Sequence, residues 1–404
     1  MKHLENVRNL VRYYSTVERE VYLDLENSTP VPPEVLQEML PYFSSKAYGN
    51  PTLTHKQGWE AYETIMDAAG FITRLIGGSS PEELCFTSGE AEANSLAVFG
   101  TAGEKPGRIV VSSIDPLTIL LPVEKLEKKG FEVVRVPVDQ EGFVDLEALS
   151  KAVNRETVLV STSMVNNEIG TIQPFREIVK TVREGNPDAT VHMDASDAYG
   201  RISFNVKDMD VDLLSLSSYK VMGPRGVAAL YVRSGVEVER IIEGPIGTQP
   251  LWPGVENTPL IVGFKKASEL AFKDFDGNVG KMRRLRDMLI NGLLSIEDTL
   301  LNGPTGEKRS PDNVNISFLH CEGESLTIEL SFKGVYVSSG SACTRRILQP
   351  SHVLTAIGRE YEAAHGSILM KVSRYHSVED IEYVLESFKP AVERIRAMSP
   401  TRRI

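Results

Sequence analysis

The sequence predicts an α/β fold with a mainly parallel, seven-stranded sheet in a large domain and a smaller α+β domain after it. Between about residues 83 and 232, short apolar runs rich in β-branched residues alternate with stretches of helical periodicity. This alternation is typical of βα units and of a sheet buried on both faces. From residue 259 on, longer helical patterns take over, and the 404 residues are enough for two domains.

The predicted strands of the large domain are short, and their Val, Ile, Leu and Thr side chains suit a pleated surface without a solvent face. They occupy residues 83–87, 108–112, 133–137, 158–162, 190–194, 213–217 and 227–232. Helical patterns at 122–129 and 175–183 lie between them. Ligands of such sheets bind outside the carboxyl ends of the strands, so functional residues are expected there.

The last third of the chain predicts four helices and one strand. The helices are expected at 261–272, 281–295, 325–332 and 378–398, and the strand at 313–318. We therefore predict a large domain over 22–262 and a small domain over 263–404 that also includes residues 1–21 and carries the Cys343 segment.

Composition excludes several classes of function. A net charge of −11 argues against a nucleic-acid partner, which needs a basic face. The first residues lack the apolar core of a secretory signal, and no run of about 18 apolar residues predicts a membrane span, so a cytoplasmic protein is expected. Cys85, Cys321 and Cys343 show no paired spacing, and the histidines show no metal-ligand spacing, so we predict no metal site formed by protein side chains alone.

Two predicted strand ends carry residues suited to pyridoxal phosphate. Asp194 ends the run 190–194, and Lys220 follows the run 213–217 into a turn. Pyridoxal phosphate needs an amine for a Schiff base and a carboxylate beside its pyridine nitrogen. The alternatives are a surface lysine and an aspartate that caps the turn after its strand.

Cys343 lies among small residues, in the segment 338–346, where a cysteine is exposed more readily than in an apolar strand. Arg345 and Arg346 follow it and favour the thiolate, which is the nucleophilic form. The alternative is a buried small residue. Cys85 and Cys321 lie in or at the end of apolar strand patterns and are interpreted as structural.

Several ordered motifs resemble those of the cysteine desulfurases, in the class V aminotransferase family of fold type I pyridoxal-phosphate enzymes. The resemblance runs over nearly the whole chain and ends with the Cys343 segment. The motifs before that segment are Val21-Tyr-Leu-Asp24, Tyr48-Gly-Asn-Pro51, Phe86-Thr-Ser-Gly89, Val165-Asn-Asn-Glu-Ile-Gly170, Gly223-Pro-Arg-Gly226 and Glu322-Gly-Glu-Ser325. It implies a fold type I aminotransferase-like homodimer.

The resemblance also implies roles for individual residues. Lys220 would carry the cofactor, Asp194 would pair with its pyridine nitrogen, and Cys343 would take sulfur from the substrate as a persulfide. The other positions implied to bind the cofactor are Asn167, Ser217, Gly89, Glu90, Ala91, Asp197 and Tyr219. Asn167 and Arg374 are expected to bind the substrate.

The chain departs from the family at positions that carry its chemistry. The family's ring-stacking histidine is Pro116 here, and the arginine that binds the substrate carboxylate is Leu369, so Lys371 or Arg374 would have to replace its charge. Around the cofactor, Ala91 stands for a threonine, Tyr219 for a histidine, Asp197 for a glutamine and Val255 for a hydroxyl residue donated by the partner subunit. Fewer phosphate contacts predict weaker cofactor binding.

The leading interpretation is a cysteine desulfurase, a transferase that moves sulfur from L-cysteine to Cys343 and then to an iron–sulfur scaffold protein. A second interpretation is a degenerate homologue that serves as an assembly partner, with Cys343 accepting sulfide or ligating an iron–sulfur cluster. A third is another class V enzyme, such as a selenocysteine lyase or an aminotransferase. The sequence alone leaves these open.

Overall fold

The computed structural model describes residues 17, 19–103, 106–340 and 350–398. The described chain forms two units. The larger comprises Ser28–Asn167 and Thr171–Asn278; the smaller comprises the residues up to Asn27, the short segment Glu168–Gly170 and the residues from Val279 on. The domain boundaries expected from the sequence, at 21/22 and 262/263, stay predictions.

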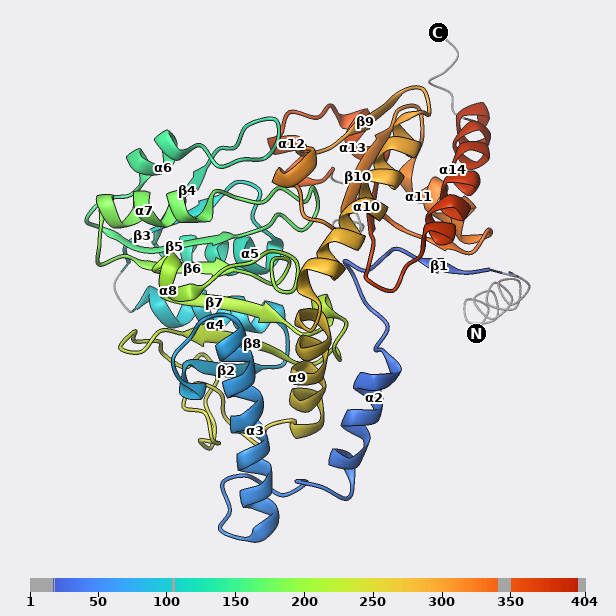
Figure 1. Ribbon diagram of the computed structural model, residues 1–404. Coiled ribbons are helices and arrows are strands. Elements are labelled where there is room, and N and C mark those ends of the chain that lie inside the picture. Colours follow the sequence, from blue (N-terminus) through green and yellow to red (C-terminus); the bar gives the residue numbers. More distant parts are fainter. Residues whose placement is uncertain (1–16, 18, 104–105, 341–349, 399–404) are drawn as a thin grey trace, which may run out of the picture. The chain divides into compact units, whose positions relative to one another are not determined.

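The larger unit is built on a mainly parallel sheet of seven strands, as predicted (Figure 1). The strands are β2 (Leu84–Thr87), β3 (Arg108–Ser112), β4 (Glu132–Val136), β5 (Thr157–Ser163), β6 (Thr190–Asp194), β7 (Leu213–Ser217) and β8 (Ala228–Val232). Their order across the sheet is β2-β8-β7-β6-β5-β3-β4, and β8 is antiparallel to both its neighbours. β6 and β7 are adjacent and parallel, so their carboxyl ends meet.

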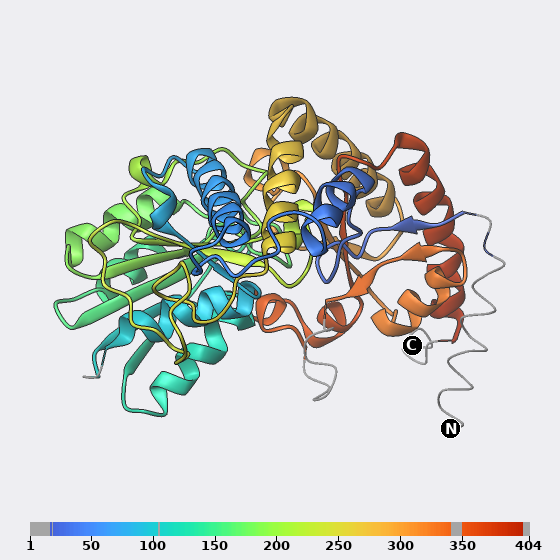
Figure 2. The same ribbon diagram turned by 90° about the horizontal axis from the view of Figure 1, so that it is seen from below.

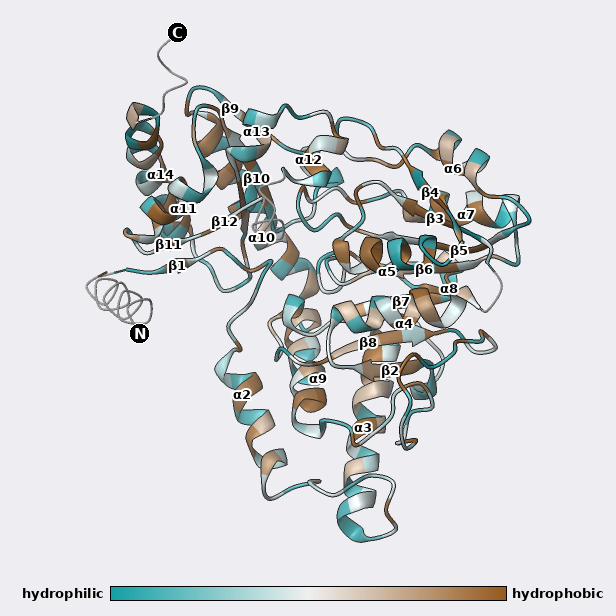
Figure 3. Cartoon of the chain, turned by 180° about the vertical axis from the view of Figure 1, so that it is seen from behind, coloured by the Kyte–Doolittle hydropathy of each residue, from teal (hydrophilic) through white to brown (hydrophobic). Residues whose placement is uncertain are grey.

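Helices cover both faces of this sheet (Figure 2). They are α2 (Pro33–Met39), α3 (Lys56–Leu75), α4 (Glu90–Ala102), α5 (Leu117–Glu127), α6 (Leu146–Ala152), α7 (Phe175–Gly185), α8 (Val206–Met209) and α9 (Thr258–Phe272), with 3-10 turns η1 (Leu40–Phe43), η2 (Pro81–Glu83) and η3 (Tyr219–Val221). Ile109 and Val111 of β3 pack with α4 and α5, whereas Val110 between them belongs to the core on the opposite face. Figure 3 shows hydrophobic residues in these strands, with polar ones between them.

The prediction of a helix start at residue 122 is wrong, because the helix begins five residues earlier. Helix α5 begins at Leu117, directly after Pro116, and contains Pro122. A proline usually marks a first turn because it lacks the N–H that a helix interior needs. Here the buried face formed by Ile119 and Val123 outweighs that lost hydrogen bond.

The smaller unit contains a four-stranded antiparallel sheet and a two-stranded pair. The sheet order is β12 (Ser338–Ser339), β13 (Ser367–Lys371), β10 (Asn313–Phe318) and β9 (Thr299–Leu301); β1 (Val21–Tyr22) pairs with β11 (Val335–Tyr336). The helices are α10 (Phe275–Leu294), which begins in the larger unit, α11 (Gly323–Ser331), α12 (His352–Ala356), α13 (Tyr361–His365) and α14 (Val378–Met398), with the 3-10 turn η4 (Gly306–Lys308). The predicted strand 313–318 and helix 378–398 are confirmed.

The segment Glu168–Gly170 leaves the larger unit and packs within the smaller one. The carbonyl of Glu168 accepts hydrogen bonds of 3.1 Å from the side-chain amides of Asn313 and Asn315. Its carboxyl accepts one of 2.6 Å from Ser351, and burial raises the pKa of Glu168 to about 8. Gly170 has φ +72°, and a Cβ there would meet Asn313 at 2.6 Å, so glycine is required.

His192 in the central strand β6 is a buried structural residue. Its Nδ1 lies 2.8 Å from the hydroxyl of Ser161, and its Nε2 lies 2.9 Å from that of Ser215. Burial lowers the pKa of His192 to about 3, so the ring is neutral at pH 7. It joins strands β5, β6 and β7 below the carboxyl edge of the sheet.

We predict that His192 makes the protein less stable as the pH falls from 7 to 5. In the unfolded chain the His192 ring binds a proton near pH 6.5, whereas in the folded chain it stays neutral down to about pH 3. The free energy of unfolding should therefore fall by about 2 kcal/mol more in the wild type than in His192→Gln. Urea unfolding of both proteins at the two pH values measures this; parallel pH dependences would contradict it.

Candidate cofactor-binding site

The carboxyl ends of β6 and β7 bring together the two residues that the sequence singled out. Asp194 is the last residue of β6, and Lys220 lies in η3, just after β7. Lys220 Nζ lies 3.0 Å from Asp197 Oδ2, and the two side chains are only 1% and 5% exposed. A buried ammonium and carboxylate at this distance form an ion pair.

The turn that presents Lys220 is held from two sides. Arg201 donates a 2.8 Å hydrogen bond to the carbonyl of Lys220, and Thr29 donates one of 2.7 Å to the carbonyl of Tyr219. The Tyr219 ring centre lies 5.4 Å from Lys220 Nζ. Sequence reasoning missed Arg201 and Thr29, because residues that bind a backbone carbonyl belong to no short motif.

Asp194 is a buried carboxylate that lacks a cation. Its oxygens accept hydrogen bonds of 2.8 Å from the Asn94 side chain and 2.9 Å from the Ser196 backbone. Burial, and then the charge of Asp197, raises the pKa of Asp194 above its usual range. Within the described ranges, no lysine, arginine or histidine forms an ion pair with it. A protonated pyridine nitrogen would supply the missing positive charge, so the residues present fit pyridoxal phosphate.

Asn94 also extends the network to helix α5. Its side-chain amide donates a 3.0 Å hydrogen bond to Thr118, whose hydroxyl in turn lies 3.4 Å from the Glu90 carboxylate. The predicted position Glu90 therefore interacts with α5. Asn94 was missed by sequence reasoning, although it lies four residues after Glu90 and thus on the same helix face.

A phosphate group would find two features suited to it. Gly89 precedes α4, no side chain of the described residues caps this helix, and a Cβ on Gly89 would meet no atom within 4 Å. Free N–H groups at a helix start bind anions. The Ser217 hydroxyl is buried and, in the part of the chain that the structure describes, has no hydrogen-bond partner. Ala91 is exposed and adds no hydroxyl, and Val255 is 63% exposed.

Pro116, which the resemblance matched to the family's histidine, is the N-cap residue of α5. The adjacent Asp115 is fully buried, and burial raises its pKa to about 7. Its carboxyl accepts hydrogen bonds from the backbone N–H groups of Ser112, at 2.7 Å, and Ser163, at 2.8 Å. Asp115 thus organises the loop, and Pro116 provides no titratable group.

The candidate substrate residues of the smaller unit differ in their surroundings. Leu369 is buried in β13, and Lys371 Nζ lies 2.6 Å from the Glu26 carboxylate. Arg374 is half-buried, with its guanidinium carbon 4.8 Å from the Tyr375 ring centre. The charge of Lys371 is balanced by Glu26, and the role of Arg374 toward a substrate carboxylate stays a prediction.

The predicted roles of Cys343 and Asn167 are not tested by the structure. Cys343 lies outside the described residues. Asn167 lies in the turn that follows the bridge between Val165 and Ile172, at the end of a segment of the larger unit. The roles of both stay predictions.

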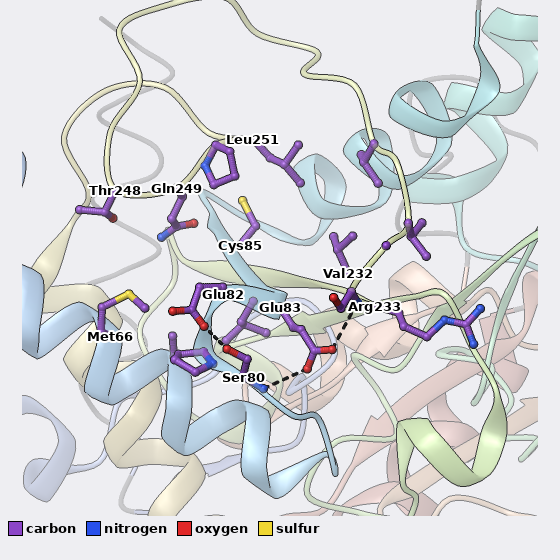
Figure 4. Close-up of a pocket in the computed structure, with 18 of the residues that line it drawn as sticks. Met66, Ser80, Glu82, Glu83, Cys85, Val232, Arg233, Thr248, Gln249 and Leu251 are labelled. Carbon is purple, nitrogen blue, oxygen red and sulfur yellow. Dashed lines mark hydrogen bonds between the residues drawn. The ribbon is translucent and has the colours of Figure 1, made fainter.

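A cavity of about 660 Å³ lies in the larger unit around Cys85 (Figure 4). Cys85 is buried, and burial raises the pKa of its thiol to about 12, so it is protonated at pH 7. The Glu83 carboxylate in the same wall accepts hydrogen bonds from the backbone of Ser79 and Ser80. Cys321 is also buried. Neither thiol has the environment of a nucleophile.

The described residues contain no cluster of three or more His, Cys, Asp or Glu side chains that could hold a metal ion. Among the helices described, none combines the length and the apolar character needed to cross a membrane.

A family model, a curated relative and two solved structures are similar to this chain over most of its length. The family model described as class V aminotransferase matches residues 21–384. A curated relative from Archaeoglobus fulgidus, "Cysteine desulfurase IscS 1", is 43% identical over 94% of this chain and 98% of its own length. A solved structure called "NIFS-LIKE PROTEIN" shares 32% identity over 93% of this chain and 100% of that one, with a TM-score of 0.87. Another, "SspA in complex with cysteine", is 30% identical over 88% of this chain and 99% of that one, with a TM-score of 0.77.

We predict that Ser217→Ala weakens pyridoxal phosphate binding without destabilising the cofactor-free protein. The hydroxyl makes no hydrogen bond within the described structure, so its removal should leave the melting temperature unchanged or slightly higher. Losing a hydrogen bond to a charged phosphate should cost about 1.5–3 kcal/mol of binding free energy. Ser218→Ala is the matched control, because that hydroxyl faces Gly223. Equal affinities of the two variants in a cofactor titration would contradict the phosphate role.

Proposed function

The chain belongs to the class V aminotransferase family, and from this membership we propose that it is a pyridoxal-phosphate-dependent cysteine desulfurase that supplies sulfur for iron–sulfur cluster assembly. The observation that carries the proposal is the buried group of Asp194, Asp197 and Lys220 at one sheet edge. It combines an amine with an unbalanced carboxylate, as pyridoxal phosphate requires.

The residues of the larger unit have separate tasks in this proposal. Bound pyridoxal phosphate withdraws electrons from the substrate Cα, which allows bonds at that carbon and its neighbour to break. Asp194 keeps a proton on the pyridine nitrogen, and Lys220 forms the covalent link. Ser217 and the first turn of α4 bind the phosphate.

Sulfur transfer is assigned to Cys343. Its thiolate forms a bond to the sulfur of L-cysteine while the bond between that sulfur and the substrate Cβ breaks. The electron pair of the broken bond stays with the substrate, whose Cβ takes up a proton, which gives L-alanine and a persulfide on Cys343. Arg345 and Arg346 favour the thiolate. The relatives named cysteine desulfurase, and the related protein solved with cysteine, support cysteine as the substrate.

The assembly around this reaction belongs to the same proposal. We expect a homodimer, an iron–sulfur scaffold protein as sulfur acceptor, and cofactor affinity lowered by Ala91, Tyr219 and Val255. A cluster bound at Cys343 and a cytoplasmic location also stay predictions.

The reaction itself gives the first test. Incubation of the cofactor-loaded protein with L-cysteine should yield alanine and a persulfide on the peptide that contains Cys343. Cys343→Ala should lose the persulfide, and Lys220→Ala should lose both products because no covalent link to the cofactor forms. Cys85→Ala, at a buried and protonated thiol, is the control. Persulfide mainly on Cys85 or Cys321 would overturn the assignment, and absence of alanine would favour the assembly-partner interpretation.

Arg374 gives a second test, on substrate binding. Arg374→Leu should raise KM for cysteine by about tenfold or more with a smaller change in kcat, because a charged hydrogen bond to the substrate is lost in the ground state. Arg394→Leu removes an arginine from α14 and serves as the matched control. A KM equal to that of the control would assign the carboxylate to another residue.

A further inference from the structure

The ion pair between Lys220 and Asp197 has a chemical consequence for cofactor loading. Asp197 Oδ2 lies 3.0 Å from Lys220 Nζ in a buried site. A carboxylate at this distance, away from water, stabilises the ammonium form of the lysine. Only the neutral amine can form a bond to an aldehyde carbon. The pair therefore holds a proton that must leave Nζ before the cofactor can be attached.

Several other titratable side chains of the larger unit have hydrogen-bond partners of their own. Asp194 is held by Asn94 and Ser196, and Glu90 interacts with Thr118. His192 is enclosed between two serines, and Arg201 contacts the carbonyl of Lys220.

Tyr219 faces Nζ with its ring, and Pro116 cannot take up a proton. Asp197 is an acceptor in direct contact with Nζ.

We propose, on the basis of the proposed function, that Asp197 is a positioning residue that keeps Lys220 an ammonium in the cofactor-free protein and receives its proton during loading. One proton moves from Nζ to Oδ2. Lys220 then bonds to the aldehyde carbon, and its two remaining protons leave with the aldehyde oxygen as water. No electron donor or acceptor is needed. The family's glutamine, being neutral, would not hold this proton.

The direction of the effect follows from the charge. Because the Asp197 carboxylate favours the ammonium, less of Lys220 is a neutral amine at pH 7 than with a neutral residue at position 197. Loading of the wild type should therefore be slow at neutral pH and faster as the pH rises. Replacing the carboxylate by an amide of the same shape should move this dependence to lower pH.

The test uses the full-length, cofactor-free protein. Pyridoxal phosphate is added between pH 6 and 9, and attachment to Lys220 is measured by borohydride trapping and peptide mass spectrometry. We expect Asp197→Asn to load about tenfold faster than wild type at pH 7, the equivalent of one pH unit. Asp197→Glu should keep the wild-type dependence. Asp208→Asn, which removes an exposed carboxylate of α8, should keep it as well.

A second measurement avoids the cofactor altogether. Reductive methylation of Lys220 by formaldehyde in the cofactor-free protein should also be faster in Asp197→Asn, because it requires the neutral amine. Equal or slower loading and methylation in Asp197→Asn would overturn the role of Asp197, whereas the proposed function would stand. If wild type never attached pyridoxal phosphate at any pH, the proposed function would fail, and the methylation rates alone would decide for or against Asp197.

Discussion

Burial of two carboxylates against one ammonium is the constraint on which the rest of the site depends. Asp194, Asp197 and Lys220 lie away from water, where each uncompensated charge costs several kcal/mol. The surrounding residues reduce this cost with hydrogen bonds. Asn94 and Ser196 donate to Asp194, while Arg201 and Thr29 fix the turn that carries Lys220. Among the described residues no cation forms an ion pair with Asp194, and a protonated ring nitrogen would supply one.

The residues predicted from the sequence were those whose role follows from local pattern. The apolar runs gave the seven strands because both faces of a parallel sheet are buried, and strand direction then placed Asp194 and Lys220 at one edge. Asn94 escaped prediction because its partner is a hundred residues away in the chain. The early start of α5 escaped it because buried side chains outweighed the usual preference of proline for a first turn.

The departures from the family replace polar side chains, most of them by apolar ones, while the fold stays the same. Strand and helix cores are set by apolar pattern, which tolerates changes at the polar edge, and a chain 43% identical to a desulfurase keeps that pattern. At the edge, the resemblance places Pro116 where the family has a titratable ring and Asp197 where it has a neutral amide. The proposed role of Asp197 would put proton transfer on Lys220 and this carboxylate.

The segment Glu168–Gly170 bears on whether the smaller unit can fold without the rest of the chain. Asn313, Asn315 and Ser310 of the smaller unit all donate hydrogen bonds to it, although it is encoded inside the larger one. A fragment that begins at Val279 would lack these acceptors and leave several buried donors unsatisfied, so the C-terminal region is not an autonomous folding piece. Gene fusions or domain exchanges among relatives would have to carry both parts together. The chain passes from one unit to the other between Asn167 and Glu168 and back between Gly170 and Thr171, with no linker residues at either point.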